Sequence, residues 1–181
     1  MVEEKKVPPP EVEVDLTAFV DDLIRILRDG GPRSLATFFQ ENPKVSPNEI
    51  FKSDRSLYRI FCKGMANSLV VDLVKFGLNP SLKDREGNCL VEIAINCRDK
   101  SMLRDLLKSG ANPNLTDSEG KSMLHVALEH ALLPREVGFI ELLLIFGAKD
   151  EKVLSEADSK MVNKKELAIK LREKFWANRK E

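Results

Sequence analysis

Asp72-Leu-Val-Lys-Phe-Gly-Leu-Asn-Pro-Ser-Leu-Lys-Asp-Arg-Glu-Gly87 has a second copy 33 residues later in the chain. The copy is Asp105-Leu-Leu-Lys-Ser-Gly-Ala-Asn-Pro-Asn-Leu-Thr-Asp-Ser-Glu-Gly120, and the two stretches align without a gap. A fixed period of this length is typical of solenoids, in which one supersecondary unit is stacked on the next. The repetition therefore predicts a stack of similar units over this part of the chain.

Each period contains signals that end one helix and begin the next. Gly77, Gly110 and Gly147 each follow an apolar helical run, at a position where the end of a helix favours positive φ. In both copies an Asn-Pro pair then forces an extended segment, and an Asp-x-x-Gly sequence supplies a turn. Each period is therefore predicted to contain a turn, a short helix, a tight connection and a second helix, and neighbouring units must stack to bury their apolar faces.

The match between the copies continues after their final glycines, where Gly87-Asn-Cys-Leu-Val-Glu-Ile-Ala94 lies over Gly120-Lys-Ser-Met-Leu-His-Val-Ala127. The second of these segments resembles the T-P-L-H-x-A signature of ankyrin repeats. Leu124, His125 and Ala127 match it, Ser122 takes the Thr place and Met123 takes the Pro place. The resemblance covers roughly residues 51–150 and implies an all-α ankyrin-repeat solenoid of helix pairs with short inter-repeat turns. It also implies that His125 makes structural hydrogen bonds within and between repeats.

The 33-residue register predicts three repeats, near 51–83, 84–116 and 117–150. The first is degenerate, because Phe61 stands where the family has a small residue. The third is longer by four residues, which fall in the segment 132–138 between its two helices.

The segments on either side of the repeats are predicted to cover the apolar ends of the stack. Residues 1–15 are charged and proline-rich, which predicts a disordered tail. Residues 16–50 and 151–181 contain amphipathic helical patterns and are predicted to be N-terminal and C-terminal helical caps. A basic amphipathic helix over 163–176 is also typical of membrane-surface or calmodulin-type elements. The alternative function is therefore a regulator whose flanking helices, 163–176 or 16–41, bind a membrane or a partner helix.

Composition narrows the possible functions and compartments. The formal net charge is zero, whereas a general nucleic-acid binder would be strongly basic. No run approaches the roughly 18 apolar residues that a membrane span requires, and the N-terminus has no apolar signal region. Cys62, Cys89 and Cys97 have neither the pairing nor the spacing of a disulfide framework or a zinc knuckle. We therefore expect a cytoplasmic monomer that binds no nucleic acid and no membrane, with the nucleus or secretion as an effector as alternatives.

Motifs for catalysis are also missing from the sequence, which has no P-loop, no dinucleotide-binding glycine motif and no nucleophile elbow. Cys97 and His130 occupy equivalent places in adjacent repeats, but helices packed about 8–10 Å apart hold such a pair too widely for a catalytic dyad. We therefore expect a protein that is not an enzyme and that uses no cofactor or metal.

The resemblance implies that another protein binds the concave face, which the turns and the ends of the first helices form. Register assigns to this face Lys52, Ser53, Arg55 and Lys63 in the first repeat, Arg85, Glu86, Asn88, Asn96 and Cys97 in the second, and Ser118, Glu119, Lys121, Glu129 and His130 in the third. The charge changes from basic in the first repeat to mixed in the third, so an acidic segment is expected on the first repeat, with association slowed by salt. The alternative is that these positions are only solvated and that the partner uses the 132–138 insertion or the convex side.

Asn114 lies eight residues after Leu106 in the inter-repeat turn. This placement is similar to that of asparagines hydroxylated in some ankyrin-repeat proteins, and the same modification is predicted here. Pro113 replaces the usual apolar β-branched neighbour, so an ordinary turn asparagine is the alternative.

Overall fold

The computed structural model describes residues 16–53, 67–133, 136–155, 158 and 161–178. Within these ranges the chain forms helices joined by turns and no β-strand, so the predicted all-α class is confirmed. The predicted tail at 1–15 lies outside the described residues. So does the segment 54–66, which was expected to hold the first helix of the 51–83 repeat.

The N-terminal part contains α1 (Leu16–Asp29), α2 (Pro32–Glu41) and α3 (Pro47–Ser53). Proline in the first turn of α2 suits a helix start, because its missing N–H has no intrahelical partner there. The apolar faces of α1 and α2 pack against each other, and α2 also contacts α5 (Asn67–Lys75). At that contact the ring of Phe39 stacks on Phe76 with a centroid separation of 5.1 Å. The helix α3 extends across the predicted boundary between cap and repeats at residue 50.

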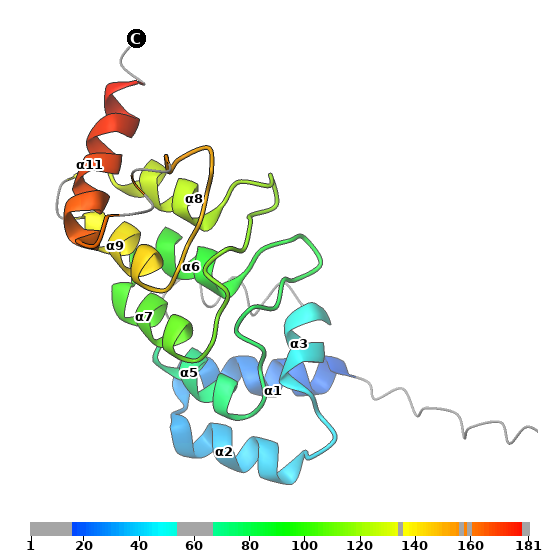
Figure 1. Ribbon diagram of the computed structural model, residues 1–181. Helices are drawn as coiled ribbons and strands as arrows, with labels where there is room; N and C mark the ends of the chain where they lie inside the picture. The colour runs from blue at the N-terminus through cyan, green and yellow to red at the C-terminus, as the bar shows by residue number, and fades with distance from the viewer. Residues whose placement is uncertain (1–15, 54–66, 134–135, 156–157, 159–160, 179–181) are drawn as a thin grey trace, which may run out of the picture.

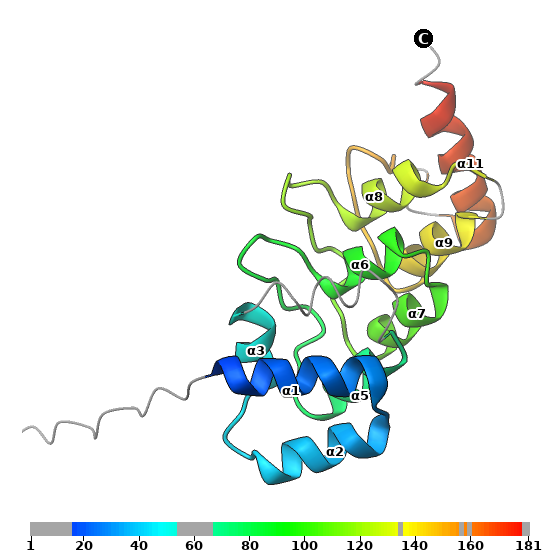
Figure 2. The same cartoon turned by 180° about the vertical axis from the view of Figure 1, so that it is seen from behind.

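The central helices are arranged in two layers, which Figures 1 and 2 show from opposite sides. One layer contains α6 (Leu90–Asn96) and α8 (Met123–His130), which contact each other. The other contains α5, α7 (Lys100–Lys108) and α9 (Val137–Ile145), which follow one another in space as in sequence. Because α6 packs on α7 and α8 packs on α9, the core runs continuously between the layers. We call α5 to α9 the helix stack.

The predicted helix stops are confirmed at Gly77, Gly110 and Gly147, whose φ angles are +98°, +92° and +88°. In each case the residue after the glycine donates its backbone N–H to the carbonyl five residues before it. These bonds join Leu78 to Leu73 at 3.0 Å, Ala111 to Leu106 at 3.0 Å and Ala148 to Leu143 at 2.8 Å. This is the Schellman arrangement, which needs a residue with positive φ and explains why glycine recurs there.

The final helix, α11 (Lys164–Ala177), packs on α9 and α8 at the C-terminal end of the stack. Asn163 caps its N-terminus, where the side chain accepts the N–H of Glu166. Its buried residues are Leu167, Ala168 and Leu171. The apolar stripe of the basic helix is therefore occupied by contacts within the chain.

Candidate interaction surface

Two turns whose backbone groups make the same internal hydrogen bonds project from the α6–α8 layer. In the first, Asp84 N–H donates to the carbonyl of Asn88 at 2.9 Å. The Asp84 carboxylate accepts the N–H groups of Glu86 and Asn88 at 2.9 and 2.8 Å, and also the Asn88 side-chain amide at 2.8 Å. The turn closes at Gly87, whose φ is +88°. These contacts hold the backbone while the side chains of Arg85 and Glu86 stay exposed.

The second turn repeats this arrangement 33 residues later. Asp117 N–H donates to the carbonyl of Lys121 at 2.9 Å, and its carboxylate accepts the N–H groups of Glu119 and Lys121 at 2.9 and 2.8 Å. Gly120 closes the turn with a φ of +80°. Ser118 and Glu119 are exposed here, as Arg85 and Glu86 are in the first turn.

The two turns lie side by side and project on the same side of the helix stack (Figures 1 and 2). A hydrogen bond of 3.0 Å joins Lys83 Nζ to Thr116 Oγ1 across the gap between them. Ser81 Oγ accepts the N–H of Asn112 at 2.8 Å in the neighbouring inter-repeat segments. The exposed turn residues are therefore carried on backbones with internal hydrogen bonds, and side-chain hydrogen bonds join the two neighbouring segments.

A small network of charges lies at the third-repeat end of this surface. Lys121 Nζ is 3.0 Å from Glu119 Oε2 and 3.4 Å from Glu129 Oε2, and these hydrogen bonds raise the pKa of Lys121. His125 Nε2 is 3.6 Å from Glu129 Oε1. Three of the residues assigned to the partner surface are thus brought together, and their charges partly neutralise one another.

The remaining assigned residues of the second and third repeats lie at the C-terminal ends of α6 and α8. Asn96 is the exposed last residue of α6, and the half-buried Cys97 follows it. His130 is the last residue of α8 and is also half-buried. Cys97 and His130 are therefore less accessible than the exposed turn residues, whereas Asn96 is exposed as they are.

The first-repeat end of the predicted surface is described only in part. Lys52 is exposed on α3, which ends at Ser53. Arg55 and Lys63 lie outside the described residues, so the predicted basic end of the surface stays a prediction. Hydroxylation of Asn114 also stays a prediction, and the structure places this residue at an exposed position where its side chain bonds the next turn.

Sequence reasoning missed Glu92, which lies on α6 between the two turn aspartates. Burial raises the pKa of Glu92, and the charges of Asp117 and Asp84 raise it further. Its Oε2 atom is buried and has no hydrogen-bond partner among the described residues. Two features of the sequence could have pointed to Glu92. It is a carboxylate within the apolar run Leu90–Asn96, and it occupies the same place in its repeat as His125 does 33 residues later. The surface therefore contains a half-buried carboxyl group that holds its proton more tightly than an ordinary glutamate.

In the described part of the chain, no group of three or more His, Cys, Asp or Glu side chains is placed to hold a metal ion. The described helices also include none with the length and apolar character needed to span a membrane. A scan of protein-family models and a search of curated proteins found no match to this sequence.

Proposed function

We propose that this protein is a non-catalytic interaction module of the ankyrin-repeat type. It binds another protein through a concave face made of the turns and of the helices α6 and α8 that follow them. The observation that carries the proposal is the pair of turns at 84–88 and 117–121, whose backbones make the same hydrogen bonds. Binding sites commonly lie on loops positioned by a rigid scaffold. Here the loop backbones are fixed by the turn aspartates, so a partner would order only the exposed side chains on binding.

The alternative in which the flanking helices carry the activity has less support. Leu167, Ala168 and Leu171 of α11 are buried, and α11 packs on α9 and α8, so a membrane or a partner helix could reach this apolar stripe only after α11 is displaced. Arg172 of α11 also donates hydrogen bonds to the carbonyls of Ala131 and Leu132 at the end of α8. These contacts favour α11 as a structural cover for the stack.

The 132–138 insertion is a second candidate contact region, because it exposes two leucines. Leu132 and Leu133 are 54% and 43% exposed. Their backbone is fixed by Arg172 and by Glu136, whose carboxylate accepts Leu133 N–H at 2.8 Å. Exposed apolar side chains on a fixed loop are typical of interaction sites.

Photo-crosslinking from defined positions of the full-length chain tests both candidates. A photoreactive phenylalanine derivative is placed at Arg85, at Ser118 or at Leu133, with exposed Arg104 on α7 as the control. In the cell of origin, we expect Arg85 and Ser118 to capture the same protein and Arg104 to capture none of it. Capture from Leu133 alone would show that the partner binds the insertion. Capture from Arg104 alone would contradict the proposal that it binds the concave face.

Charge reversal then tests the contact by a separate measurement. Arg85→Glu should weaken binding of the captured partner by about tenfold, with most of the change in the association rate. Arg104→Glu is the matched control and should leave affinity unchanged. Because both side chains are exposed, neither change should alter folding.

A further inference from the structure

A hollow of about 200 Å³ lies between α8, the segment at 152–153 and α11. Its apolar walls come from Leu128, Val153, Leu171 and Phe175. His125 completes one wall, and its ring meets Phe175 edge-on with a centroid separation of 5.3 Å. An apolar cavity of about 150 Å³ holds a benzene molecule, so this hollow has room for one aromatic ring or one branched aliphatic side chain.

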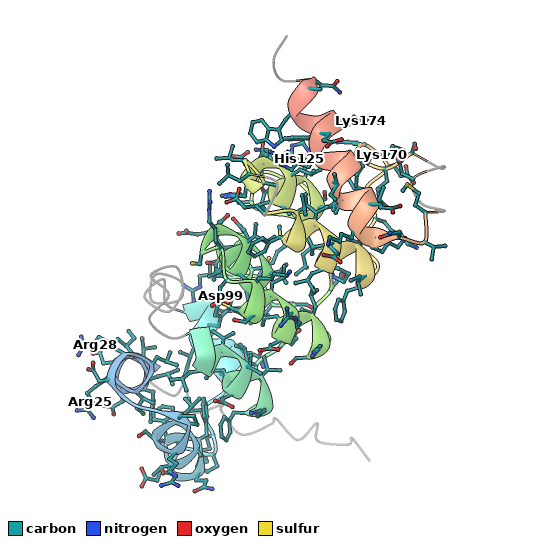
Figure 3. The ribbon with its side chains drawn as sticks, turned by 90° about the vertical axis from the view of Figure 1, so that its left-hand side faces the viewer. Arg25, Arg28, Asp99, His125, Lys170 and Lys174 are labelled. Atoms are coloured by element: carbon teal, nitrogen blue, oxygen red, sulfur yellow. The ribbon has the colours of Figure 1, made fainter. Side chains whose placement is uncertain are left out.

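The mouth of the hollow is polar and positively charged. Lys152, Lys174 and Asn178 contribute to its lining from two different segments, and all three are exposed. Figure 3 labels Lys174 on α11 and His125 on α8, at the same end of the molecule. The hollow therefore combines apolar walls with two ammonium groups and one amide that can donate hydrogen bonds.

Among the described residues, the carboxylates near this mouth leave Lys152 and Lys174 available. Over the residues that the structure describes, no carboxylate lies within ion-pair distance of Lys152 or Lys174. Glu129 contacts His125 and Lys121 instead, and Lys170 contacts Asp158. Glu151 and Glu173 are exposed neighbours in the sequence, but neither lines the hollow.

We propose that this hollow binds a carboxylate carried by an aromatic or branched apolar group. The apolar group fills the space between Leu128, Val153 and Phe175, and the carboxylate lies between Lys152 and Lys174. Ammonium–carboxylate hydrogen bonds are stronger than neutral ones, and the apolar walls around them supply the selectivity for the attached group. A free acid and the C-terminal residue of a polypeptide share this chemistry. The inference does not depend on the concave-face proposal, because the two use different residues.

The single tryptophan of the chain provides the readout. Trp176 is next to Phe175, with ring centroids 5.7 Å apart, so its fluorescence reports on occupancy of the hollow. Full-length protein is titrated with N-acetyl-phenylalanine and with its amide, which has the same ring but no carboxylate. We expect a saturable change with the acid and binding of the amide weaker by at least about tenfold. Backbone amide NMR shifts at Val153 and Phe175 give a second readout if the emission of Trp176 does not respond.

Charge reversal of the two rim lysines tests the assigned residues. The double variant Lys152→Glu, Lys174→Glu should lose binding of the acid by at least about tenfold, since attraction becomes repulsion. Lys165→Glu, on the same helix but outside the hollow, is the matched control and should bind as the wild type does. Far-UV circular dichroism of each variant establishes that it is folded.

A hexapeptide ending in phenylalanine distinguishes the two sources of the carboxylate. Binding at least about tenfold tighter than that of the free acid identifies a polypeptide C-terminus, because more of the ligand then contributes contacts. Binding of the acid without binding of the peptide identifies a small molecule. Three results would overturn the proposal: no saturable signal in either readout, equal binding of acid and amide, or wild-type affinity in the folded double variant.

Discussion

Asn48 on α3 and Asn114 each make the same pair of hydrogen bonds to a turn that begins at a helix-ending glycine. Asn48 Nδ2 donates to Gly77 O at 2.8 Å, and its Oδ1 accepts the N–H of Asn79 at 2.7 Å. Asn114 Nδ2 donates to Gly147 O at 3.3 Å, and its Oδ1 accepts the N–H of Lys149 at 2.7 Å. One side chain thus satisfies both a carbonyl and an N–H of the next turn.

Removing this amide should loosen the attachment between successive turns. Asn48→Ala and Asn114→Ala should each lower the stability by about 1 kcal/mol, the usual net contribution of such hydrogen bonds. For a chain of this length that corresponds to a fall of about 2–4 °C in the melting temperature. Gln40→Ala, at an exposed position on α2, is the control. Melting of both asparagine variants at the wild-type temperature would show that the bonds contribute nothing.

Ser81 occupies the equivalent position between these two asparagines, and its hydroxyl accepts the N–H of Asn112. A serine is too short to reach a second partner as the asparagines do. Ser81→Asn should therefore raise the melting temperature, because its amide can also donate to the carbonyl of Gly110. Thermal melting followed by circular dichroism measures the effect, and a lower melting temperature would contradict it.

The raised pKa of Glu92 predicts a pH-dependent effect on stability. The folded state holds this proton more tightly than the unfolded state does. Stability should therefore fall as the pH rises above 4.5, the ordinary pKa of a glutamate. Glu92→Gln keeps the neutral form at every pH, so it should melt above the wild type at about pH 7 and close to it at about pH 4. Glu173→Gln, on the exposed face of α11, is the control. Equal differences at both pH values would exclude titration of Glu92 as the cause.

The two cysteines in the described residues should differ in reactivity towards iodoacetamide. Burial raises the pKa of the Cys89 thiol to about 11, so about one in a thousand is ionised at about pH 8. Cys97 is only half-buried. Peptide-level mass spectrometry of the native protein should therefore show modification of Cys97 well before Cys89. The difference should disappear in denaturant, and faster labelling of native Cys89 would contradict its burial.

The contact between Asp158 and Lys170 should stabilise the docked position of α11. Lys170 Nζ lies 2.6 Å from the buried carboxylate, and Ser155 Oγ lies 2.7 Å from it. These bonds hold the pKa of Asp158 well below its usual value of 3.8. They therefore stabilise the folded protein at pH values above 3.8, and this stabilisation is lost as the pH falls through the lowered pKa.

Lys170→Met should therefore lower the melting temperature at about pH 7 by a few degrees, and Lys165→Met should leave it nearly unchanged. The difference between the two variants should shrink as the solution is acidified below about pH 3. If Lys170→Met melts as the wild type does at neutral pH, the ion pair with Asp158 does not help to hold α11, and apolar packing is sufficient.

Features that depend on neighbours in the chain were predictable from the residues alone. A glycine at positive φ and an aspartate that accepts N–H groups two and four positions ahead both express local backbone geometry. For this reason the helix stops at Gly77, Gly110 and Gly147 and the turns that begin at Asp84 and Asp117 match what the sequence predicts.

Features that join distant segments depended on how the helices pack. Arg98 has a φ of +55°, which its residue type does not predict, and its guanidinium pairs with Glu136 across the connections between helices. The burial of Glu92 and the hollow lined by Val153 and Phe175 likewise arise from segments that meet only in the folded chain. Burial and electrostatic environment are set by the neighbours that packing brings together, and a 33-residue period specifies which residues are equivalent without specifying what surrounds them.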